Sequence, residues 1–358
     1  MNNKKKFLLA GLGVCVVILA AVIVVQSFVI QPPAAIELAK LPAGEYDPAV
    51  WGGYYPLEYE SYRKNLEMTP SPTGFGGSVN EQKSIKEPEI LMNFKGMAFS
   101  KDYSEDRGHP YSLEDLMSSE RVTPATVGSC MTCKTPYIKD VFKEKGWEYA
   151  NLPLSEVIKG AGHPISCANC HDPATMKLTV ANPAFIEAMQ KKGIDVHEAS
   201  RKEMRSYVCG QCHSEYYFEP KTNRVVFPWD KGYTPEQMYA YYEEKPAGFE
   251  KDWVHPDSQA KMLKAQHPDF ETWAGGVHGK SGVSCADCHM PFTLKNGQKY
   301  SSHWVTSPMR NVQESCRTCH TQSEDWLLER VKTVQNNVWQ LQHTAGQAVA
   351  RAHEVIGK

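Results

Sequence analysis

Ten of the eleven cysteines in this 358-residue chain stand in five C-x-x-C pairs, and only Cys15 lies outside them. Four pairs are followed at once by a histidine. C-x-x-C-H is the attachment pattern of haem c, in which both thiols add to the porphyrin vinyl groups and the imidazole binds the iron. The pairs are Cys130/Cys133, Cys167/Cys170, Cys209/Cys212, Cys285/Cys288 and Cys316/Cys319, and the histidines are His171, His213, His289 and His320.

Zinc is the competing interpretation, because two C-x-x-C pairs can form one tetrahedral Cys₄ site. Five pairs do not divide into twos, and zinc gives no reason for a histidine directly after the second cysteine. The pattern therefore favours five covalent haems. A haem iron that only transfers electrons takes a second strong ligand, so four of these haems need a further histidine each.

One pair departs from the rule, since Cys133 is followed by Lys134. A lysine can bind iron only as the neutral amine, although its ordinary pKa is about 10.4. An electron carrier has no need of that arrangement, so this haem is the candidate catalytic site. The alternatives are a haem site that has lost its histidine and a plain C-x-x-C redox pair.

Residues 1–30 predict an N-terminal signal anchor. Three lysines at positions 4–6 precede an uncharged, mostly apolar run from Phe7 to Val25, close to the roughly 20 residues that span a bilayer. A cleaved signal peptide is the alternative, although its apolar region is typically shorter, at about 7–15 residues, and no A-x-A-like site follows. Cys15 lies inside the apolar run after Val14, which argues against lipid attachment. Either way, we expect the body of the protein at the periplasmic or extracytoplasmic face.

Short helical signals alternate with loops between residues 96 and 321, and no run of strands is long enough for a sheet-based fold. Asn182 and Pro183 predict a helix start with a stop at Gly193, and Thr234 with Gln237 forms a capping-box pattern. Residues 31–67 predict little regular structure, and residues 68–87 predict a loop. The fold class is therefore mainly α: a multihaem cytochrome c with short helices and long loops around five haems.

A long C-terminal helix is expected over residues 322–358, after a catalytic domain at residues 31–321. Ser323 and two acidic residues open it. Its apolar residues form a heptad seam, which is typical of a buried packing face and of a dimerisation helix. The seam is still running at Lys358, so we expect the sequence to be incomplete there. Its members are Leu327, Val331, Val334, Val338, Leu341, Ala345, Ala348, Ala352 and Val355.

The formal net charge of −2 offers no basic footprint for nucleic acid, and no nucleic-acid partner is expected.

From Trp51 to Lys358 the sequence resembles the ammonia-forming pentahaem cytochrome c nitrite reductases. That family has one C-x-x-C-K and four C-x-x-C-H sites in this order. Three further motifs carry the resemblance. They are R-G-H at residues 107–109, C-G-Q-C-H-S-E-Y-Y-F at 209–218 and M-L-K-A-Q-H-P-D-F-E-T-W-A-G-G-V-H-G-K at 262–280.

The resemblance implies that Lys134 is the proximal ligand of the catalytic haem and that its distal pocket holds Arg121, Tyr216 and His267. It implies His109 as the distal ligand of the haem on Cys209/Cys212, His303 for Cys167/Cys170, and His278 for Cys316/Cys319. It also implies one calcium ion, because oxygen donors match a calcium site: side chains of Glu215 and Gln266, and backbone carbonyls of Tyr216 and Lys264.

The family's distal histidine for the haem on Cys285/Cys288 lies on a further segment that this sequence lacks. His343 and His353 do not match that position, so this ligand is not assigned. His163, His197 and His255 are interpreted as ordinary polar residues.

The resemblance implies six-electron reduction of nitrite to ammonium, with a membrane-bound multihaem quinol dehydrogenase as electron donor and a homodimer as the assembly. Two alternatives stay open. One is a non-catalytic electron-transfer cytochrome in which all five irons are six-coordinate, and the other is a related multihaem reductase of hydroxylamine or sulfite.

Overall fold

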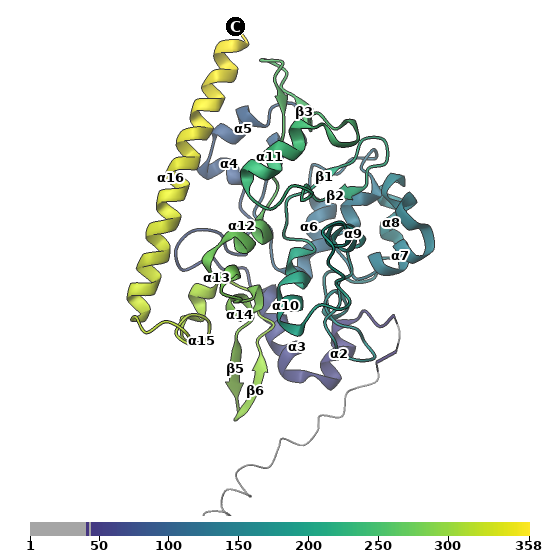
Figure 1. The fold of residues 1–358 in the computed structure, drawn as a ribbon, viewed down its shortest axis with the longest axis vertical. Helices are drawn as coiled ribbons and strands as arrows, with labels where there is room; N and C mark the ends of the chain where they lie inside the picture. The colour runs from purple at the N-terminus through teal and green to yellow at the C-terminus, as the bar shows by residue number, and fades with distance from the viewer. Residues whose placement is uncertain (1–40, 43) are drawn as a thin grey trace, which may run out of the picture. The chain divides into compact units, whose positions relative to one another are not determined.

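The computed structural model of the chain describes residues 41–42 and 44–358. Short helices and loops make up most of this part, and one long helix, α16, runs along the body from α15 to α5 (Figure 1). The α-helices are α2 (Pro48–Tyr54), α3 (Pro56–Arg63), α4 (Lys83–Lys86), α5 (Glu89–Asn93), α6 (Ser112–Ser118), α7 (Ile138–Lys145), α8 (Leu154–Val157), α9 (Pro183–Lys191), α10 (Arg201–Gly210), α11 (Pro235–Glu243), α12 (Asp269–Gly275), α13 (Val277–Lys280), α14 (Cys285–His289), α15 (Val312–Ser315) and α16 (Glu324–Ile356).

The strands of the described residues form three separate antiparallel ribbons of two strands each. No layer of sheet organises this part of the chain, which confirms the predicted mainly α class with a long C-terminal helix. The ribbons pair β1 (Tyr217–Phe218) with β2 (Val225–Val226), β3 (Trp253–Val254) with β4 (Lys261–Met262), and β5 (Phe292–Lys295) with β6 (Gln298–Ser301).

The largest apolar cluster lies between α9, α10, α12 and the segment after β2. Phe185 of α9 packs edge-on against Trp229 and Phe270, with ring centroids 5.6 and 5.8 Å apart. A second cluster surrounds Met131 and Tyr149, which are fully buried. The first cluster supports α10, which leads into the cysteine pair at residues 209–212, and the second supports the pair at residues 130–133.

Helix ends follow the sequence where polar caps were recognisable. The Asn182 side chain accepts a hydrogen bond from the Ala184 N–H at the start of α9. Thr234 and Gln237 form the reciprocal capping box of α11, and Ser323 caps α16. These contacts satisfy N–H groups that have no partner within the helix, which is why the predicted starts are confirmed.

Two predictions were wrong near the N-terminal end of the described part. Residues 31–67 were expected to hold little regular structure, yet α2, α3 and a 3₁₀ turn at Lys64–Leu66 follow one another there. Asp47 caps α2 and each α-helix has a proline in its first turn, a strong start signal that the aromatic-rich composition obscured. The loop expected over 68–87 also contains α4.

The predicted seam of α16 packs within this chain at its start, where Leu327 is buried, but its later members are largely exposed. Val334 is 43% exposed, Leu341 72% and Val355 69%. The packed face of the lower half runs instead through His343, Gly346, Ala350 and His353, on a neighbouring stripe with similar spacing. Glycine at 346 lets α5 come close, because a Cβ there would lie 3.2 Å from Cγ of Glu89.

No helix within residues 41–42 and 44–358 has the length and apolar composition of a membrane span. The signal anchor predicted for residues 1–30, with Cys15, lies outside the described residues. The division into a domain at 31–321 and a dimerisation helix at 322–358 stays a prediction.

Candidate functional site

The five cysteine pairs lie close to one another rather than being spread over the body. None of these ten cysteines of the described residues forms a disulfide, and neighbouring pairs lie side by side: Cys133 is within hydrogen-bond reach of Cys212, and Cys209 of Cys285. The Cys288 thiol in turn lies near enough to Cys316 for the two to interact electrostatically. The pairs therefore form a continuous series through the molecule, a spacing that suits relayed electron transfer.

Cys319 is the exception among the ten predicted attachment cysteines. Cys319 is exposed, whereas the other nine are partly buried. It lies in the turn between α15 and α16, where the Thr318 hydroxyl is 3.9 Å from its Sγ. The fifth site thus lies at the surface end of the series, and the role of Cys319 in holding a haem stays a prediction.

The histidines of these motifs are oriented through Nδ1. The Nδ1 of His171 lies 3.0 Å from the Met176 carbonyl oxygen, and that of His289 lies 3.1 Å from the Thr306 carbonyl oxygen. The Nδ1 of His213 lies 3.2 Å from the Asp269 carboxylate. Metal-binding histidines generally donate this second N–H to a carbonyl or carboxylate, which leaves Nε2 for the metal.

Two expected distal histidines face their proximal partners. The ring centroids of His171 and His303 are 6.1 Å apart, as are those of His278 and His320. Two metal–nitrogen bonds of about 2 Å account for roughly 4 Å of such a separation, and the distance from each nitrogen to its ring centre accounts for the rest. The residues present therefore fit one iron between each pair.

Burial and neighbouring rings keep several of these histidines neutral. Desolvation and the nearby His303 lower the pKa of His171 to about 4, and desolvation with His213 lowers that of His109 to about 4. Burial also lowers the pKa of His303 and His289. A neutral imidazole is the form that binds a metal. His213 differs, because its hydrogen bond to Asp269 raises its pKa.

Asn65 holds the segments that carry two expected distal ligands. Its buried side chain donates to the His303 carbonyl oxygen at 2.7 Å and accepts from the Val305 N–H at 2.9 Å. Its backbone contacts Gly108, where a Cβ would lie 2.2 Å from the Asn65 carbonyl oxygen. The glycine of R-G-H therefore permits the close approach that places His109 at the start of its 3₁₀ turn, His109–Tyr111.

Arg107 completes the R-G-H motif as a structural residue. Its Nε donates to Asp115 at 2.7 Å, and its guanidinium carbon lies 3.8 Å from the centre of the Tyr111 ring. Both partners follow His109 in the chain, so Arg107 fixes the turn rather than reaching the site.

Lys134 ends the C-M-T-C-K turn in a firmly held backbone. Its carbonyl oxygen accepts a hydrogen bond from the Ser112 hydroxyl at 2.8 Å, and the same hydroxyl accepts from the Ile165 N–H at 3.0 Å. The Thr132 hydroxyl lies 2.7 Å from that of Tyr149. The turn is thus tied both to α6 and to the segment before the second cysteine pair.

The expected distal-pocket residues come from three separate segments. Tyr216 and His267 lie together, with ring centroids 5.7 Å apart, and Arg121 is near enough to act electrostatically on Tyr216. Burial raises the pKa of Tyr216 far above its ordinary value, so the phenol keeps its proton. Desolvation and His213 lower the pKa of His267 to about 4.

His267 also lies 6.0 Å from His213, a spacing close to that of the two expected ligand pairs. Ring spacing alone therefore does not separate His109 from His267 as the partner of His213. The two histidines differ in their surroundings. His267 contacts Tyr216, whereas His213 and Lys134 both act electrostatically on His109.

The two residues inside C-G-Q-C-H have structural roles. A Cβ on Gly210 would lie 2.4 Å from the Phe270 ring, so glycine lets α10 approach the segment that carries His267. Buried Gln211 accepts from the Ala181 N–H at 2.7 Å and donates to the Asn169 carbonyl oxygen at 3.2 Å. The C-G-Q-C-H motif therefore positions neighbouring segments as well as its own cysteines and histidine.

The expected calcium residues meet beside Tyr216. The buried Glu215 carboxylate accepts from the Gln266 N–H at 2.5 Å, and Gln266 Oε1 accepts from Lys264 Nζ at 3.0 Å. Burial raises the pKa of Glu215 to about 7, since the carboxylate is desolvated without full compensation. Nearby Oε2 of Glu271 is buried with no hydrogen-bond partner in the described chain.

This set fits calcium through oxygen donors of mixed kind, namely a carboxylate, an amide and backbone carbonyls. Within residues 41–42 and 44–358 no cluster of three or more His, Cys, Asp or Glu side chains is arranged for a metal ion.

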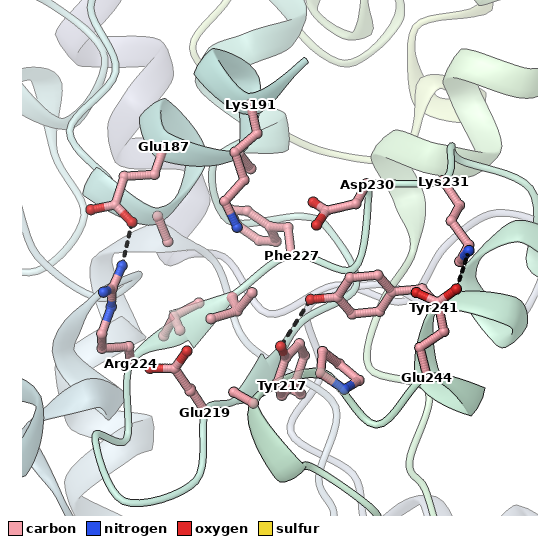
Figure 2. A pocket seen from close by; sticks show the side chains of 16 residues that line it. Glu187, Lys191, Tyr217, Glu219, Arg224, Phe227, Asp230, Lys231, Tyr241 and Glu244 are labelled. Carbon is pink, nitrogen blue, oxygen red and sulfur yellow. Dashed lines mark hydrogen bonds and ion pairs between the residues drawn. The ribbon is translucent and has the colours of Figure 1, made fainter.

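A separate cleft of about 650 Å³ lies between α9, β1, β2 and α11, and it contains none of the predicted site residues (Figure 2). Polar side chains of its lining pair with one another: Arg224 with Glu187, Lys231 with Glu244, and Tyr217 with Tyr241. Its lining carries charged side chains of both signs and does not indicate a particular ligand.

The sequence-based interpretation missed His255. This residue is fully buried, and its ring stacks on His353 with centroids 3.8 Å apart and planes 4° apart. Together with the 2.7 Å contact between His343 and Glu89, it fastens α16 to the body. The histidines of α16 are therefore packing residues, and no motif in the sequence marks them.

Comparison with known proteins places these features in a family. Residues 47–358 match the family model described as Cytochrome c552. The chain is 41% identical over 307 residues to cytochrome c-552 of Bacteroides thetaiotaomicron, which covers 84% of this chain and 62% of that protein. The chain therefore spans less than two thirds of that relative's length.

It is also 36% identical over 395 aligned positions to the cytochrome c nitrite reductase subunit NrfA of Nitratidesulfovibrio vulgaris, covering 99% of this chain and 74% of that protein. The solved NrfA catalytic subunit of Desulfovibrio desulfuricans, described with two calcium sites, superposes with a TM-score of 0.82 at 34% identity, covering 89% of this chain and 73% of that one. This chain thus belongs to the cytochrome c552 family, which includes the NrfA subunits of cytochrome c nitrite reductases.

Proposed function

We propose that this chain carries the nitrite-reducing site of an ammonia-forming cytochrome c nitrite reductase. The observation that carries the proposal is the single C-x-x-C-K turn, set in a series of four C-x-x-C-H sites and accompanied by Tyr216, His267 and Arg121. Membership of the family supports haem as cofactor and nitrite as substrate.

Conversion of nitrite to ammonium requires six electrons and the removal of two oxygens as water. Cys130, Cys133 and Lys134 would hold a haem, which when bound would supply the redox chemistry of nitrite reduction. The chain's residues do the rest of the work: they bind the anion, orient it and supply protons.

Arg121 is the residue suited to hold the anion. A cation about 4 Å from a nitrite oxygen contributes roughly 4 kcal/mol of attraction at an effective dielectric constant near 20. His267 shares this task through a ring N–H and, like Tyr216, would also supply a proton. Tyr216 keeps its phenolic proton at neutral pH and can donate it to a departing oxygen, a role worth typically about 10²–10⁴ in rate.

The four remaining sites would hold electron-transfer haems. His109, His303 and His278 would provide the second histidine of three of them, and no second histidine is assigned to the haem on Cys285/Cys288. The total of five haem c groups rests on the five cysteine pairs.

Calcium belongs to the same proposal. Glu215 and Gln266 would bind it with side-chain oxygens, and Tyr216 and Lys264 with carbonyl oxygens. Glu215→Ala should abolish calcium retention and lower the melting temperature, whereas Glu236→Ala, at an exposed position on α11, should change neither. Calcium-free protein of unchanged stability and activity would remove the metal from the assignment.

The wider assembly is proposed on the same basis. We place the protein at the extracytoplasmic face, anchored by residues 1–30 and reduced by a membrane-bound multihaem quinol dehydrogenase. The exposed seam residues of α16, Val334, Val338 and Leu341, support a homodimer through residues 322–358.

Two measurements test the proposed function. Electron paramagnetic resonance of the oxidised protein should show four low-spin haems and one whose signal changes when nitrite is added; five low-spin haems insensitive to nitrite would favour a non-catalytic carrier. Turnover assays with nitrite, hydroxylamine and sulfite should show ammonium formed from nitrite, and sulfite as the preferred substrate would place the chain among the related reductases.

A further inference from the structure

Arg121 is held in an unusual way for a charged residue. Its Nε donates to the Ser119 hydroxyl at 3.1 Å, its backbone N–H reaches the same oxygen at 3.2 Å, and its guanidinium carbon lies 4.4 Å from the centre of the Phe99 ring. Among the described residues, nothing bonds its two terminal nitrogens and no carboxylate pairs with it. The side chain is therefore oriented while its charge and its bidentate edge stay available to an anion.

Ser119 can accept both hydrogen bonds because its own proton is committed elsewhere. The hydroxyl donates to Oδ2 of Asp102 at 2.6 Å, a short bond of the charge-assisted kind. The same carboxylate oxygen accepts from the Glu120 N–H at 3.0 Å. Asp102 thus fixes two consecutive residues, 119 and 120, immediately before Arg121.

Asp102 is itself buried and fully satisfied. Its other oxygen accepts from Gln82 Nε2 at 2.7 Å and from the Ser104 hydroxyl at 3.0 Å. Burial on its own would raise the pKa of Asp102, but the hydrogen bonds outweigh it and the pKa is lowered, so the group is ionised at neutral pH. A buried carboxylate is tolerated only when donors satisfy it, and Asp102 has four.

The separation between the two charges is the informative feature. A direct ion pair between Asp102 and Arg121 would neutralise the arginine and compete with nitrite. With one hydroxyl between them, the carboxylate orients the guanidinium through Ser119 and leaves its hydrogen-bonding edge free. The Phe99 ring, packed against Tyr103 at 4.8 Å, fixes the plane of the guanidinium from a second direction.

We propose that Asp102 and Ser119 are positioning residues that set the pose of Arg121 and, through it, the affinity of the site for anions. This inference rests on the proposed function, in which Arg121 holds nitrite. It concerns residues outside every motif that carries the resemblance to the family.

The test uses the full, haem-loaded chain and follows nitrite binding to the oxidised protein by optical titration. Ser119→Ala should weaken nitrite binding about tenfold, the loss of roughly one hydrogen bond to a charged group. Ser119→Thr keeps the hydroxyl and should bind nitrite within about twofold of the parent protein, since the lost bond is restored. Binding of carbon monoxide, a neutral ligand, to the reduced protein should be unchanged in both.

Ser104→Ala is the matched control. It removes another hydroxyl from the same carboxylate without touching Arg121, so it should leave nitrite affinity as it is. A double-mutant cycle with Arg121→Ala tests whether Ser119 acts through Arg121. Ser119→Ala should have no further effect on nitrite binding once the arginine is gone. Haem content and melting temperature of every variant show that it has folded.

The outcomes are distinguishable. Equal losses in Ser104→Ala and Ser119→Ala, or a full effect of Ser119→Ala in the Arg121→Ala background, would overturn the inference while leaving the proposed function intact. So would a strong effect of Arg121→Ala with none from Ser119→Ala. If Arg121→Ala itself binds nitrite normally, the assignment of Arg121 fails, and this inference fails with it.

Discussion

The C-x-x-C-H sites and the Lys134 site are built on opposite plans. At His171 the ligand and the carbonyl that orients it lie five residues apart, in one turn of the chain. At the proposed Lys134 site, the side chains that we assign to nitrite come from three distant segments, at Arg121, Tyr216 and His267. An electron-transfer haem requires only a neutral, oriented imidazole on each side, whereas a substrate site requires a pattern of charge and proton donors around open space.

This difference explains why the two kinds of site respond differently to change. A ligand site depends on the contacts that orient its histidines, which are short-range at His171 and long-range at His213 and His303, and it loses its ligand orientation when those contacts break. The substrate site is preorganised by long-range packing, so single residues can reduce its chemistry without reducing haem binding. The predictions below separate these two kinds of failure.

His267→Ala should give the largest functional loss. Nitrite turnover should fall by at least about 10²-fold, the lower end of what a positioned proton donor provides, while all five haems stay attached. His197→Ala, at an exposed turn, is the control. Turnover within a few-fold of the parent would remove His267 from the mechanism and make the Lys134 site resemble the other four.

Asn65→Ala tests a haem ligand site rather than the substrate site. It leaves the Val305 N–H and the carbonyl oxygens of His303 and Tyr62 without their buried partner, so the free energy of unfolding should fall by about 2–3 kcal/mol. The low-spin spectrum of the haem on Cys167/Cys170 should change as well. Asn336→Ala, on the exposed face of α16, should do neither; equal effects of the two would show that Asn65 has no special role.

The predictable part of the ligand sites is the part that is local in the sequence. The cysteine pairs, the cap of α9 and the capping box of α11 each depend on residues within a few positions of one another. Glu215 and Gln266 were accessible only through a family resemblance, since 51 positions separate the atoms in contact.

The parts that were not predictable depend on distant partners. Asn65, Asp102 and His255 are buried polar residues whose hydrogen bonds or ring contacts join remote segments, and each looks ordinary in the sequence. The packed face of α16 was misplaced for the same reason. Its apolar stripe was visible, but the stripe that packs in the lower half combines small residues and histidines, with the contact of His343 with Glu89 and the small Gly346.

The exposure of Cys319 was likewise not predictable from the sequence, because a C-x-x-C-H motif has the same residue pattern whether it lies inside the body or at its surface. Burial depends on what the rest of the chain packs around the motif.

Lys134→His would convert the exceptional site into a fifth C-x-x-C-H motif. Haem occupancy should stay the same or rise in a generic expression host, because the standard attachment machinery accepts that motif. Axial ligand identity shifts haem potentials over a range of about 0.8 V, so the potential should move and turnover should fall by about tenfold, or ~1.4 kcal/mol of barrier. A fully loaded variant that forms ammonium at the parent rate would show that lysine ligation is incidental.

Asp269→Asn should give the smallest effect, and it asks whether the four histidine sites are equivalent. His213 is the one proximal histidine whose Nδ1 meets a carboxylate rather than a backbone carbonyl, among those whose Nδ1 contact is known. Its site also adjoins that of Lys134 through Cys133 and Cys212. A carboxylate partner makes an imidazole a stronger donor and favours the oxidised iron, so the neutral amide should raise the potential of this haem.

The expected rise is about 30 mV, the one-electron equivalent of roughly 0.7 kcal/mol, measured by spectroelectrochemical titration. Glu329→Gln removes one negative charge from the exposed side of α16 and controls for net charge alone. If both variants shift the potential equally, Asp269 acts only as a distant charge. If neither does, the Asp269 contact contributes nothing to the donor strength of His213. A shift confined to Asp269→Asn would show that the haem next to the substrate site is kept easier to oxidise, which favours passage of each electron to the Lys134 iron.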